Sequence, residues 1–361
     1  MRIAVEPLPG GGRPRPADPA ALGFGRVFTD RMLTAQWDAR RGWHDARIEP
    51  YGPICLEPCA AVFHYGQEVF EGLKAYRRAD GGVFLFRPEM NLARLNRSAA
   101  RLALPEVPGD LFLEGIAELV RLEREWVPGA EGTSLYIRPT LIAVEPALGV
   151  RPSDRCRFFV ILSPVGPYYA RGFAPVRILV EDHYVRAVAG GTGAAKAGGN
   201  YAASLAAGLK ARERGFDQVL WLDGVHRRYV EEVGAMNIFF VAGGRLVTPP
   251  LTGSFLAGIT RVSVLALAGA LGLEAEERPV AIEELLADLR GGRVVEAFGT
   301  GTAAVIAPVG ALGYRDEVVP VGDGGVGPVT RRLYDELTGI QCGRLPDRFG
   351  WMRRVWPEGG R

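Results

Sequence analysis

Gly190-Gly191-Thr192-Gly193-Ala194-Ala195-Lys196-Ala197-Gly198-Gly199-Asn200-Tyr201 places one lysine among residues that have almost no side chains. A lysine that binds a carbonyl group covalently needs little steric cover, a desolvated position and a nearby hydroxyl or charge. Tyr201 supplies a hydroxyl on what the pattern predicts to be the first turn of a helix over residues 200–214. Taken alone, the segment fits two interpretations: a flexible surface loop, or a cradle for a bulky group close to the backbone.

The glycines also raise the question of a nucleotide-binding motif. A P-loop needs glycine directly before its lysine and serine or threonine after it, whereas Ala195 and Ala197 flank Lys196. A second turn, Gly299 to Ala304, fits G-x-G-x-x-A and follows a strand-like run. An extended apolar run follows this turn instead of a clear helix, so the match to a dinucleotide fingerprint is weak. A dinucleotide-dependent oxidoreductase stays open as an alternative.

The length and composition of the chain are typical of a soluble globular protein. Its 361 residues allow a large core and suggest two domains, and 48% hydrophobic with 23% charged residues is ordinary for a soluble protein. A net charge of +2 argues against nucleic acid or an acidic membrane as partner. No apolar run is long enough to span a membrane, and the N-terminus lacks the apolar core of a signal peptide. The four cysteines, Cys55, Cys59, Cys156 and Cys342, show no paired metal spacing, which predicts reduced thiols, a cytoplasmic location and no metal site.

Strand and helix patterns alternate along the chain and predict a mixed α/β fold in two domains. We expect a flexible arm over 1–20, an N-terminal α/β domain over 21–163, a linker over 164–174 and a C-terminal domain over 175–361. Strands are expected at 83–86, 134–142, 157–162, 176–180, 219–222 and 237–241. Helices are expected from about 91, and over 111–126, 200–214, 260–271 and 282–289.

Six blocks together resemble the branched-chain amino acid aminotransferases. They are FHYGQEVFEGLKAY at 63–76, FRP at 86–88 with Asn91 and Arg94, TSLYIRP at 133–139, KAGGNY at 196–201, EEVGAMN at 231–237 and FGTGTA at 298–303. Their order and spacing are those of the family from about Phe24 onward. The resemblance implies a fold type IV pyridoxal-phosphate enzyme of the D-amino acid aminotransferase-like kind, with a smaller N-terminal domain and a larger, cofactor-binding C-terminal domain. It also implies a homodimer or an assembly of dimers.

The resemblance assigns pyridoxal 5'-phosphate to particular residues. Lys196 is implied to bind the aldehyde and then to act as base and acid in transamination. Glu232 is implied to face the pyridine nitrogen and keep it protonated, and Tyr201 to hydrogen-bond the ring oxygen. Glu231, the neighbour of Glu232, is expected to be solvated because strand residues alternate in direction. The phosphate is assigned to one arginine and to groups at a helix start and in the glycine turn: Arg94, Gly258, Ile259, Thr260 and Thr302.

The substrates implied are leucine, isoleucine and valine, with 2-oxoglutarate as the amino acceptor and branched-chain 2-oxo acids and L-glutamate as products. One pocket must then accept an aliphatic side chain and, in turn, a charged one, which aromatic walls with a few donors can do. The residues implied as walls are Phe24, Tyr65, Phe70, Tyr136, Val150 and Tyr168. Arg138 is the candidate for the distal carboxylate of glutamate, and Thr302 and Ala303 face the substrate's α-carboxylate.

The sequence departs from the vertebrate branch of the family at two places, a redox-active cysteine pair and a hydroxyl side chain near the cofactor. That branch has a redox-active Cys-x-x-Cys where Ala304 and Ala307 stand here, and a threonine where Ala235 stands. The four histidines, His44, His64, His183 and His226, match no catalytic role. Within the fold, a D-amino acid aminotransferase and an aminodeoxychorismate lyase remain alternatives, although Tyr136-x-Arg138 and Phe70-Glu71-Gly72 favour the branched-chain enzymes. A catalytically silent cofactor-binding protein is an alternative from another class.

Overall fold

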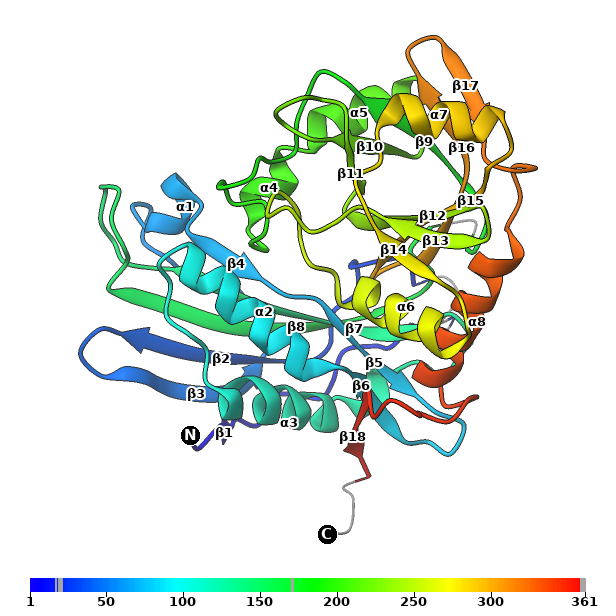
Figure 1. Ribbon diagram of the computed structural model, residues 1–361. Coiled ribbons are helices and arrows are strands. Elements are labelled where there is room, and N and C mark those ends of the chain that lie inside the picture. Colours follow the sequence, from blue (N-terminus) through cyan, green and yellow to red (C-terminus); the bar gives the residue numbers. More distant parts are fainter. Residues whose placement is uncertain (17, 19–21, 170–171, 358–361) are drawn as a thin grey trace. The chain divides into compact units, whose positions relative to one another are not determined.

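A computed structural model describes residues 1–16, 18, 22–169 and 172–357 (Figure 1). The chain forms two compact units. Unit 1 comprises Met1–Ala170, Ala195–Gly198 and Ile340–Arg361, and unit 2 comprises Arg171–Ala194 and Gly199–Gly339. Lys196 therefore belongs to unit 1, although the chain on both sides of it belongs to unit 2.

Unit 1 is built on one sheet with the strand order β1-β3-β2-β8-β7-β5-β6-β18, and β4 also pairs with β7. Its strands are β1 Ala4–Val5, β2 Arg31–Asp38, β3 Gly42–Pro50, β4 Glu68–Phe70, β5 Leu73–Arg77, β6 Val83–Phe86, β7 Ser134–Ala143, β8 Arg155–Val165 and β18 Met352–Trp356. Apart from the parallel pair β1–β3, neighbouring strands are antiparallel.

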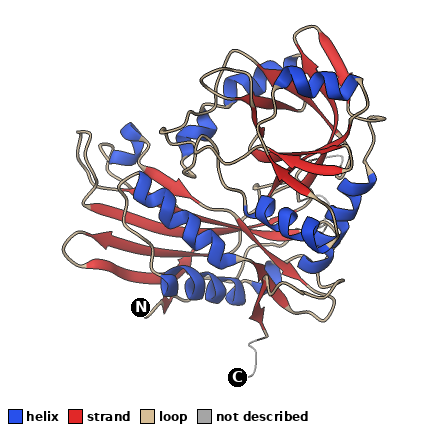
Figure 2. Cartoon of the chain, viewed as in Figure 1, coloured by secondary structure: helices blue, strands red, loops and turns tan. Residues whose placement is uncertain are grey.

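One face of this sheet is covered by helices, which Figure 2 shows in blue across the red strands. The helices are α1 Ala61–Tyr65, α2 Pro88–Arg101 and α3 Gly115–Leu122, with a π-helical turn at Asp110–Glu114 and a 3₁₀ turn at Arg124–Trp126. Leu95 of α2, Leu119 of α3 and Leu135 and Ile137 of β7 are fully buried in a common core. Because strand side chains alternate, Tyr136 and Arg138 lie on the opposite face of β7.

Unit 2 contains a sheet whose path β11-β10-β9-β16-β15-β12 closes on itself through the pair β11–β12. The strands are β9 Val176–Glu181, β10 Gln218–Leu222, β11 Val230–Val233, β12 Met236–Ala242, β13 Arg245–Thr248, β14 Ala275–Glu277, β15 Val294–Gly301, β16 Val305–Tyr314 and β17 Glu317–Pro320. The helices of this part of the chain are α4 Gly198–Ala202, α5 Leu205–Glu213, α6 Ile259–Ala270, α7 Ile282–Arg290 and α8 Pro328–Gln341. All four residues of β11 are buried, so their polar side chains need partners inside the unit.

Most predicted elements are confirmed, with two differences. The helix expected over 200–214 is two helices, α4 and α5, because the hydroxyl of Ser204 bonds to the Tyr201 carbonyl and interrupts the helical pattern. The helix expected over 111–126 is α3 between the two short turns named above. The turn after Gly301 joins the antiparallel strands β15 and β16, in agreement with the extended run expected there, and no helix follows it. A dinucleotide site at Gly299 to Ala304 is therefore wrong, since that motif needs a strand–turn–helix unit.

Within the expected arm, Ala4–Val5 pairs with Arg47 and Ile48 as β1, while residues 17, 19 and 20 of the arm and 170–171 of the expected linker lie outside the described residues. The segment Ile340–Arg361 belongs to unit 1 because β18 pairs with β6, whereas the sequence placed it in the C-terminal domain. The domain boundaries given above remain a prediction; this segment and Ala195–Gly198 are both assigned to unit 1, whereas the predicted boundaries place them in the C-terminal domain. In the described ranges, no helix combines the length and apolar character needed to cross a membrane.

Candidate active site

The backbone of Lys196 is fixed on both sides within unit 1. Its N–H donates to Oγ of Ser98 on α2 at 2.9 Å, and its carbonyl accepts from the N–H of Phe70 at 3.0 Å. The flanking Ala195 and Ala197 are each 4% exposed, and Nζ of Lys196 lies 5.0 Å from the centre of the Phe70 ring. The lysine is thus carried by an anchored segment of small residues, which rules out the flexible surface loop.

Arg94 is held by a buried carboxylate of unit 1. Its Nε and Nη2 donate to the two oxygens of Glu71 at 2.6 and 2.9 Å, and Nδ2 of Asn91 donates to Glu71 at 2.7 Å. Burial alone would raise the pKa of Glu71, but the Arg94 charge and these hydrogen bonds lower it overall. Arg94 is 4% exposed, so it is no surface arginine. Glu71 and Asn91 were not assigned from the sequence, although the i,i+3 spacing of Asn91 and Arg94 on a helix was a usable signal.

Four of the six implied wall residues lie close to one another or to Arg138 in unit 1. The ring of Phe24 lies 4.9 Å from that of Tyr136 and 5.3 Å from that of Tyr168. The Phe70 ring lies 4.7 Å from Cζ of Arg138. Tyr65 and Val150 are both exposed: the N–H of Gly149 donates to the Tyr65 hydroxyl at 2.7 Å, and Val150 is 89% exposed.

Arg138 has an unmet hydrogen-bond donor. Its Nη2 donates to the Tyr136 hydroxyl at 3.0 Å, and its guanidinium stacks on the Phe70 and Tyr136 rings. Its Nε is buried and, among the described residues, has neither a hydrogen-bond partner nor an acidic group in ion-pair contact. Gly72 is required beside it, since a Cβ there would collide with the Tyr136 hydroxyl. A planar cation in this state suits a carboxylate.

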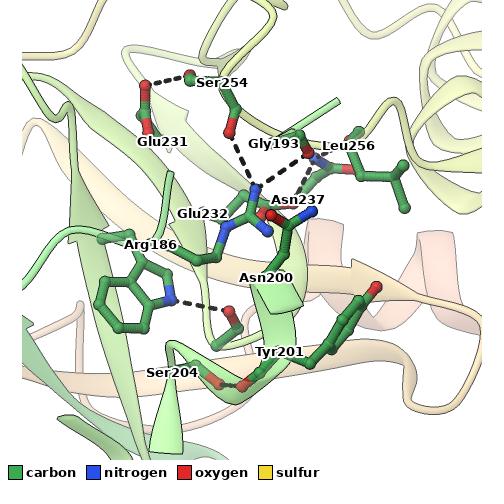
Figure 3. A network of polar contacts seen from close by, with 12 residues as sticks. Arg186, Gly193, Asn200, Tyr201, Ser204, Glu231, Glu232, Asn237, Ser254 and Leu256 are labelled. Atoms are coloured by element: carbon green, nitrogen blue, oxygen red, sulfur yellow. Dashed lines mark hydrogen bonds and ion pairs between the residues drawn. The ribbon is translucent and has the colours of Figure 1, made fainter. Parts of the chain in front are cut away.

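In unit 2, Glu232 is embedded in a polar network that Figure 3 shows at close range. Nε of Arg186 lies 2.9 Å from Oε2 of Glu232, and the two side chains are 7% and 4% exposed. Nδ2 of Asn237 donates to Oε1 of Glu232 at 3.3 Å and to the Leu256 carbonyl at 3.0 Å. The ion pair stabilises the charged form of Glu232, the form that a protonated ring nitrogen would need opposite it.

Glu231 is not solvated, which corrects the expectation from the sequence. It is 7% exposed, and the hydroxyl of Ser254 donates to it. Burial raises the pKa of Glu231 despite this bond and the nearby Arg186 charge. The alternation along β11 does send the two glutamates to different partners, but both sides of this strand face the interior of the unit.

Arg186 also fastens two loops of unit 2, and it is a residue that the sequence did not reveal. Its Nη2 donates to the Ser254 carbonyl at 3.0 Å and to the Gly193 carbonyl at 3.4 Å, contacts drawn as dashed lines in Figure 3. Gly193 is needed because a Cβ there would collide with the Ser254 carbonyl. No local sequence motif predicts the role of Arg186, since its partners come from distant parts of the chain.

Unit 2 also offers groups for an anion. Helix α6 begins after Gly258 without a side-chain cap, so the amides of Ile259 and Thr260 are left for another acceptor, and both residues are 5% exposed. The hydroxyl of Thr300 is buried with no described hydrogen-bond partner. Thr302 and Ala303 lie in the turn between β15 and β16, half-buried, next to Val305 at φ 63°. That value is rare for a β-branched residue and marks a constrained turn.

Each unit, taken by itself, holds groups whose chemistry suits a part of pyridoxal 5'-phosphate. Unit 1 offers Lys196 and Arg94; unit 2 offers Glu232, Tyr201 on α4, and the uncapped start of α6 with the unmatched Thr300 hydroxyl. An amine, a carboxylate and an anion site suit an aldehyde, a ring nitrogen and a phosphate respectively. Within the described ranges no group of three or more His, Cys, Asp or Glu residues could hold a metal ion.

Comparison with known proteins agrees with this chemistry. The family profile for amino-transferase class IV matches residues 68–312. Branched-chain-amino-acid aminotransferase 2 of Bacillus subtilis (strain 168) is 54% identical over 343 residues, which cover 95% of this chain and 94% of that protein.

Solved structures give the same family. The branched-chain amino acid aminotransferase of Escherichia coli has a TM-score of 0.74 at 30% identity, covering 90% of this chain and 99% of its own. The branched-chain amino acid aminotransferase from Thermobaculum terrenum, solved in its PLP form, has a TM-score of 0.74 at 27% identity, covering 90% and 98%. With its anchored lysine, its buried acid and these relatives, the chain belongs to the class IV aminotransferases, in the fold type IV group of branched-chain enzymes.

Proposed function

We propose that this protein is a pyridoxal-phosphate-dependent branched-chain amino acid aminotransferase that uses 2-oxoglutarate as its acceptor and acts as a cytoplasmic homodimer. The substrate assignment rests on the side chains that surround Arg138. Aromatic rings of Phe70 and Tyr136 lie against a guanidinium whose Nε has no described partner. One surface thus offers apolar contact for leucine, isoleucine or valine and a cation for the distal carboxylate of glutamate.

Each side chain has a task in the reaction. Pyridoxal phosphate, when bound, supplies an electron sink for the pair left at the α-carbon as its proton departs. Lys196 takes up that proton at Nζ and returns it on the next carbon, and Ser98 and the Phe70 amide hold its backbone in place. Glu232, paired with Arg186, would hold a proton on the ring nitrogen of the cofactor. For the phosphate, Arg94 of unit 1 would supply charge, and the start of α6 in unit 2 would supply backbone amides.

Three features support the finer parts of the proposal. The relatives named above carry branched-chain amino acids in their names, and one of them was solved in its PLP form. All four cysteines are free thiols, as is usual in a reducing compartment. The exposed apolar side chains of Phe63, Leu148 and Val150 in unit 1 suit burial against a second copy.

Turnover of leucine, isoleucine and valine with 2-oxoglutarate tests the proposal, with glutamate measured as product. D-alanine as donor and aminodeoxychorismate without any acceptor are the matched alternatives within the fold. Turnover of the three L-amino acids with glutamate formed in equal amounts is expected. Activity confined to D-amino acids, or pyruvate formation from aminodeoxychorismate, would overturn the substrate assignment.

A further inference from the structure

A second carboxylate, Glu68, shares a face of the unit 1 sheet with Arg138. In the antiparallel pair β4–β7, Glu68 lies opposite Ile142 and Phe70 lies opposite Thr140. Directly opposed residues point to the same face, and alternate residues of a strand do so too. Glu68, Phe70 and Arg138 therefore lie on one face, whereas Val69 and Leu141 are fully buried on the other.

The Glu68 carboxylate is tied to the segment that carries the cofactor lysine. Its Oε1 accepts the N–H of Gly198, two residues after Lys196. A Cβ at Gly198 would collide with that same oxygen, so a larger residue there would displace the Glu68 carboxylate. Glu68 is thus held in place by the backbone beside Lys196.

Burial and one nearby positive charge have opposite effects on the pKa of Glu68. Burial raises the pKa of Glu68, while the Gly198 amide and the Arg138 charge lower it by less. Of the described elements packed against it, β7 contributes Arg138 as the acting charge, the segment 195–198 contributes the Gly198 amide, and α2 contributes none. Arg138 in turn has no described acid in ion-pair contact, so its charge and that of Glu68 offset one another through space.

On the basis of the proposed function, we propose that Glu68 is a specificity residue, which stays charged beside Arg138 when an aliphatic side chain is bound and takes up one proton when a distal carboxylate binds Arg138. With a leucine side chain in place, one anion and one cation are present. With a glutamate side chain, a second anion approaches the same cation. A proton from solvent on Glu68 restores the balance, and the neutral carboxyl still accepts the Gly198 amide through its carbonyl oxygen.

The sign of the pH dependence follows from this exchange. A second anion raises the pKa of Glu68 in the complex above its value in the free enzyme. Affinity for a dicarboxylate is therefore greatest below the pKa of the free enzyme and falls as pH rises through it. One linked proton gives at most about a tenfold loss of affinity per pH unit. A monocarboxylate brings no second anion and shows no such loss.

The test measures dissociation constants of two non-reacting ligands for the holoenzyme, glutarate and 4-methylvalerate, over a series of pH values from acidic to mildly alkaline. These ligands share one carboxylate and differ in the far group. The ratio of the two constants cancels any effect of pH that acts on both ligands alike. We expect glutarate to weaken with rising pH relative to 4-methylvalerate. A constant ratio over the whole range would overturn the proposal without any variant.

The variant Glu68→Gln keeps the acceptor for Gly198 and removes the titration. We expect its ratio to be independent of pH and glutarate to bind more tightly than in the wild type at the alkaline end. Glu49→Gln is the matched control, because Glu49 is a half-buried carboxylate of the same sheet that accepts the Thr34 hydroxyl at 2.9 Å. An unchanged pH slope in Glu68→Gln would refute the role of Glu68. If Arg138→Met still weakens glutarate selectively in that case, the proposed function stands; if neither ligand distinguishes Arg138→Met from the wild type, the assignment of Arg138 falls as well.

Discussion

Nε of Arg186 lies 2.9 Å from Oε2 of Glu232, and the pair is almost completely buried inside unit 2. A buried ion pair gains little over an apolar pair, but removal of one partner leaves an uncompensated charge. Arg186 also holds the carbonyls of Ser254 and Gly193, so it joins the acid to two loops. Its loss would therefore be felt in both stability and geometry.

Arg186→Met is expected to lower the free energy of unfolding by about 3–5 kcal/mol, because Glu232 is left charged and buried. Chemical denaturation of the variant measures this loss. The double variant Arg186→Met with Glu232→Gln should recover part of it, since the stranded charge is gone. Strictly additive losses in the two single variants and the double variant would mean that the two side chains do not interact in solution.

Glu232→Gln tests the acid by itself. A neutral amide cannot hold the ring nitrogen protonated, so we expect proton transfer at the α-carbon to slow by at least about tenfold, or about 1.4 kcal/mol of barrier. Single-turnover rates with leucine on the cofactor-loaded variant measure the step. Glu231→Gln is the matched control from the adjacent position of β11, where the carboxylate accepts Ser254 instead. Rates equal to the wild type would place Glu232 away from the ring nitrogen.

Arg138→Met is expected to harm glutamate far more than leucine, because only glutamate brings a second carboxylate. The loss of a buried charge partner costs about 2–5 kcal/mol, which would appear in kcat/KM for glutamate. Arg138→Lys keeps the charge but loses the planar donor pair and the stacking on Phe70. Its kcat/KM for glutamate should therefore lie between those of the wild type and Arg138→Met. Equal losses for leucine and glutamate would assign Arg138 a purely structural role.

The enzyme is expected to withstand mild peroxide. Ala304 and Ala307 occupy the positions of the redox-active cysteines in the vertebrate branch, and neither can be oxidised in that way. Burial raises the pKa of Cys156 to about 12 and also raises that of Cys342, so few reactive thiolates form there. Activity and free thiols are measured together during a peroxide titration. We expect activity to persist even as thiols are oxidised. Activity that falls with one thiol and returns on reduction would contradict this, and Cys55→Ser would test the exposed thiol first.

Local patterns allowed much of the molecule to be predicted. The small residues around Lys196, the short block at 86–94 that contains Arg94, and the strand that presents Glu232 are all features of short segments. Tyr136 and Arg138 share a face because they are two residues apart on β7, which the sequence also predicted. Alternation and motif spacing are enough in such cases.

The features that could not be predicted depend on contacts between distant segments. Arg186 reaches Glu232, Ser98 reaches the Lys196 amide, and Glu68 reaches Gly198 only after folding. The burial of Glu231 was missed because strand alternation predicts direction but not what lies on either side. The break between α4 and α5 was missed because a serine hydroxyl competes for a helix carbonyl.

Lys196 is the residue expected to carry the cofactor, and this sequence allows a sharp test because its lysines number three: Lys74, Lys196 and Lys210. Lys74 is a real competitor, since burial lowers its pKa to about 8, whereas Lys210 is paired with Glu181 at 3.3 Å. The measurement is borohydride reduction of the cofactor-loaded enzyme followed by peptide mass mapping, with Lys196→Ala as the control. We predict a pyridoxyl mass on Lys196 alone, and no labelled peptide and no transamination in Lys196→Ala. A label on Lys74 or Lys210, or near-normal turnover in Lys196→Ala, would show that Lys196 does not hold the cofactor.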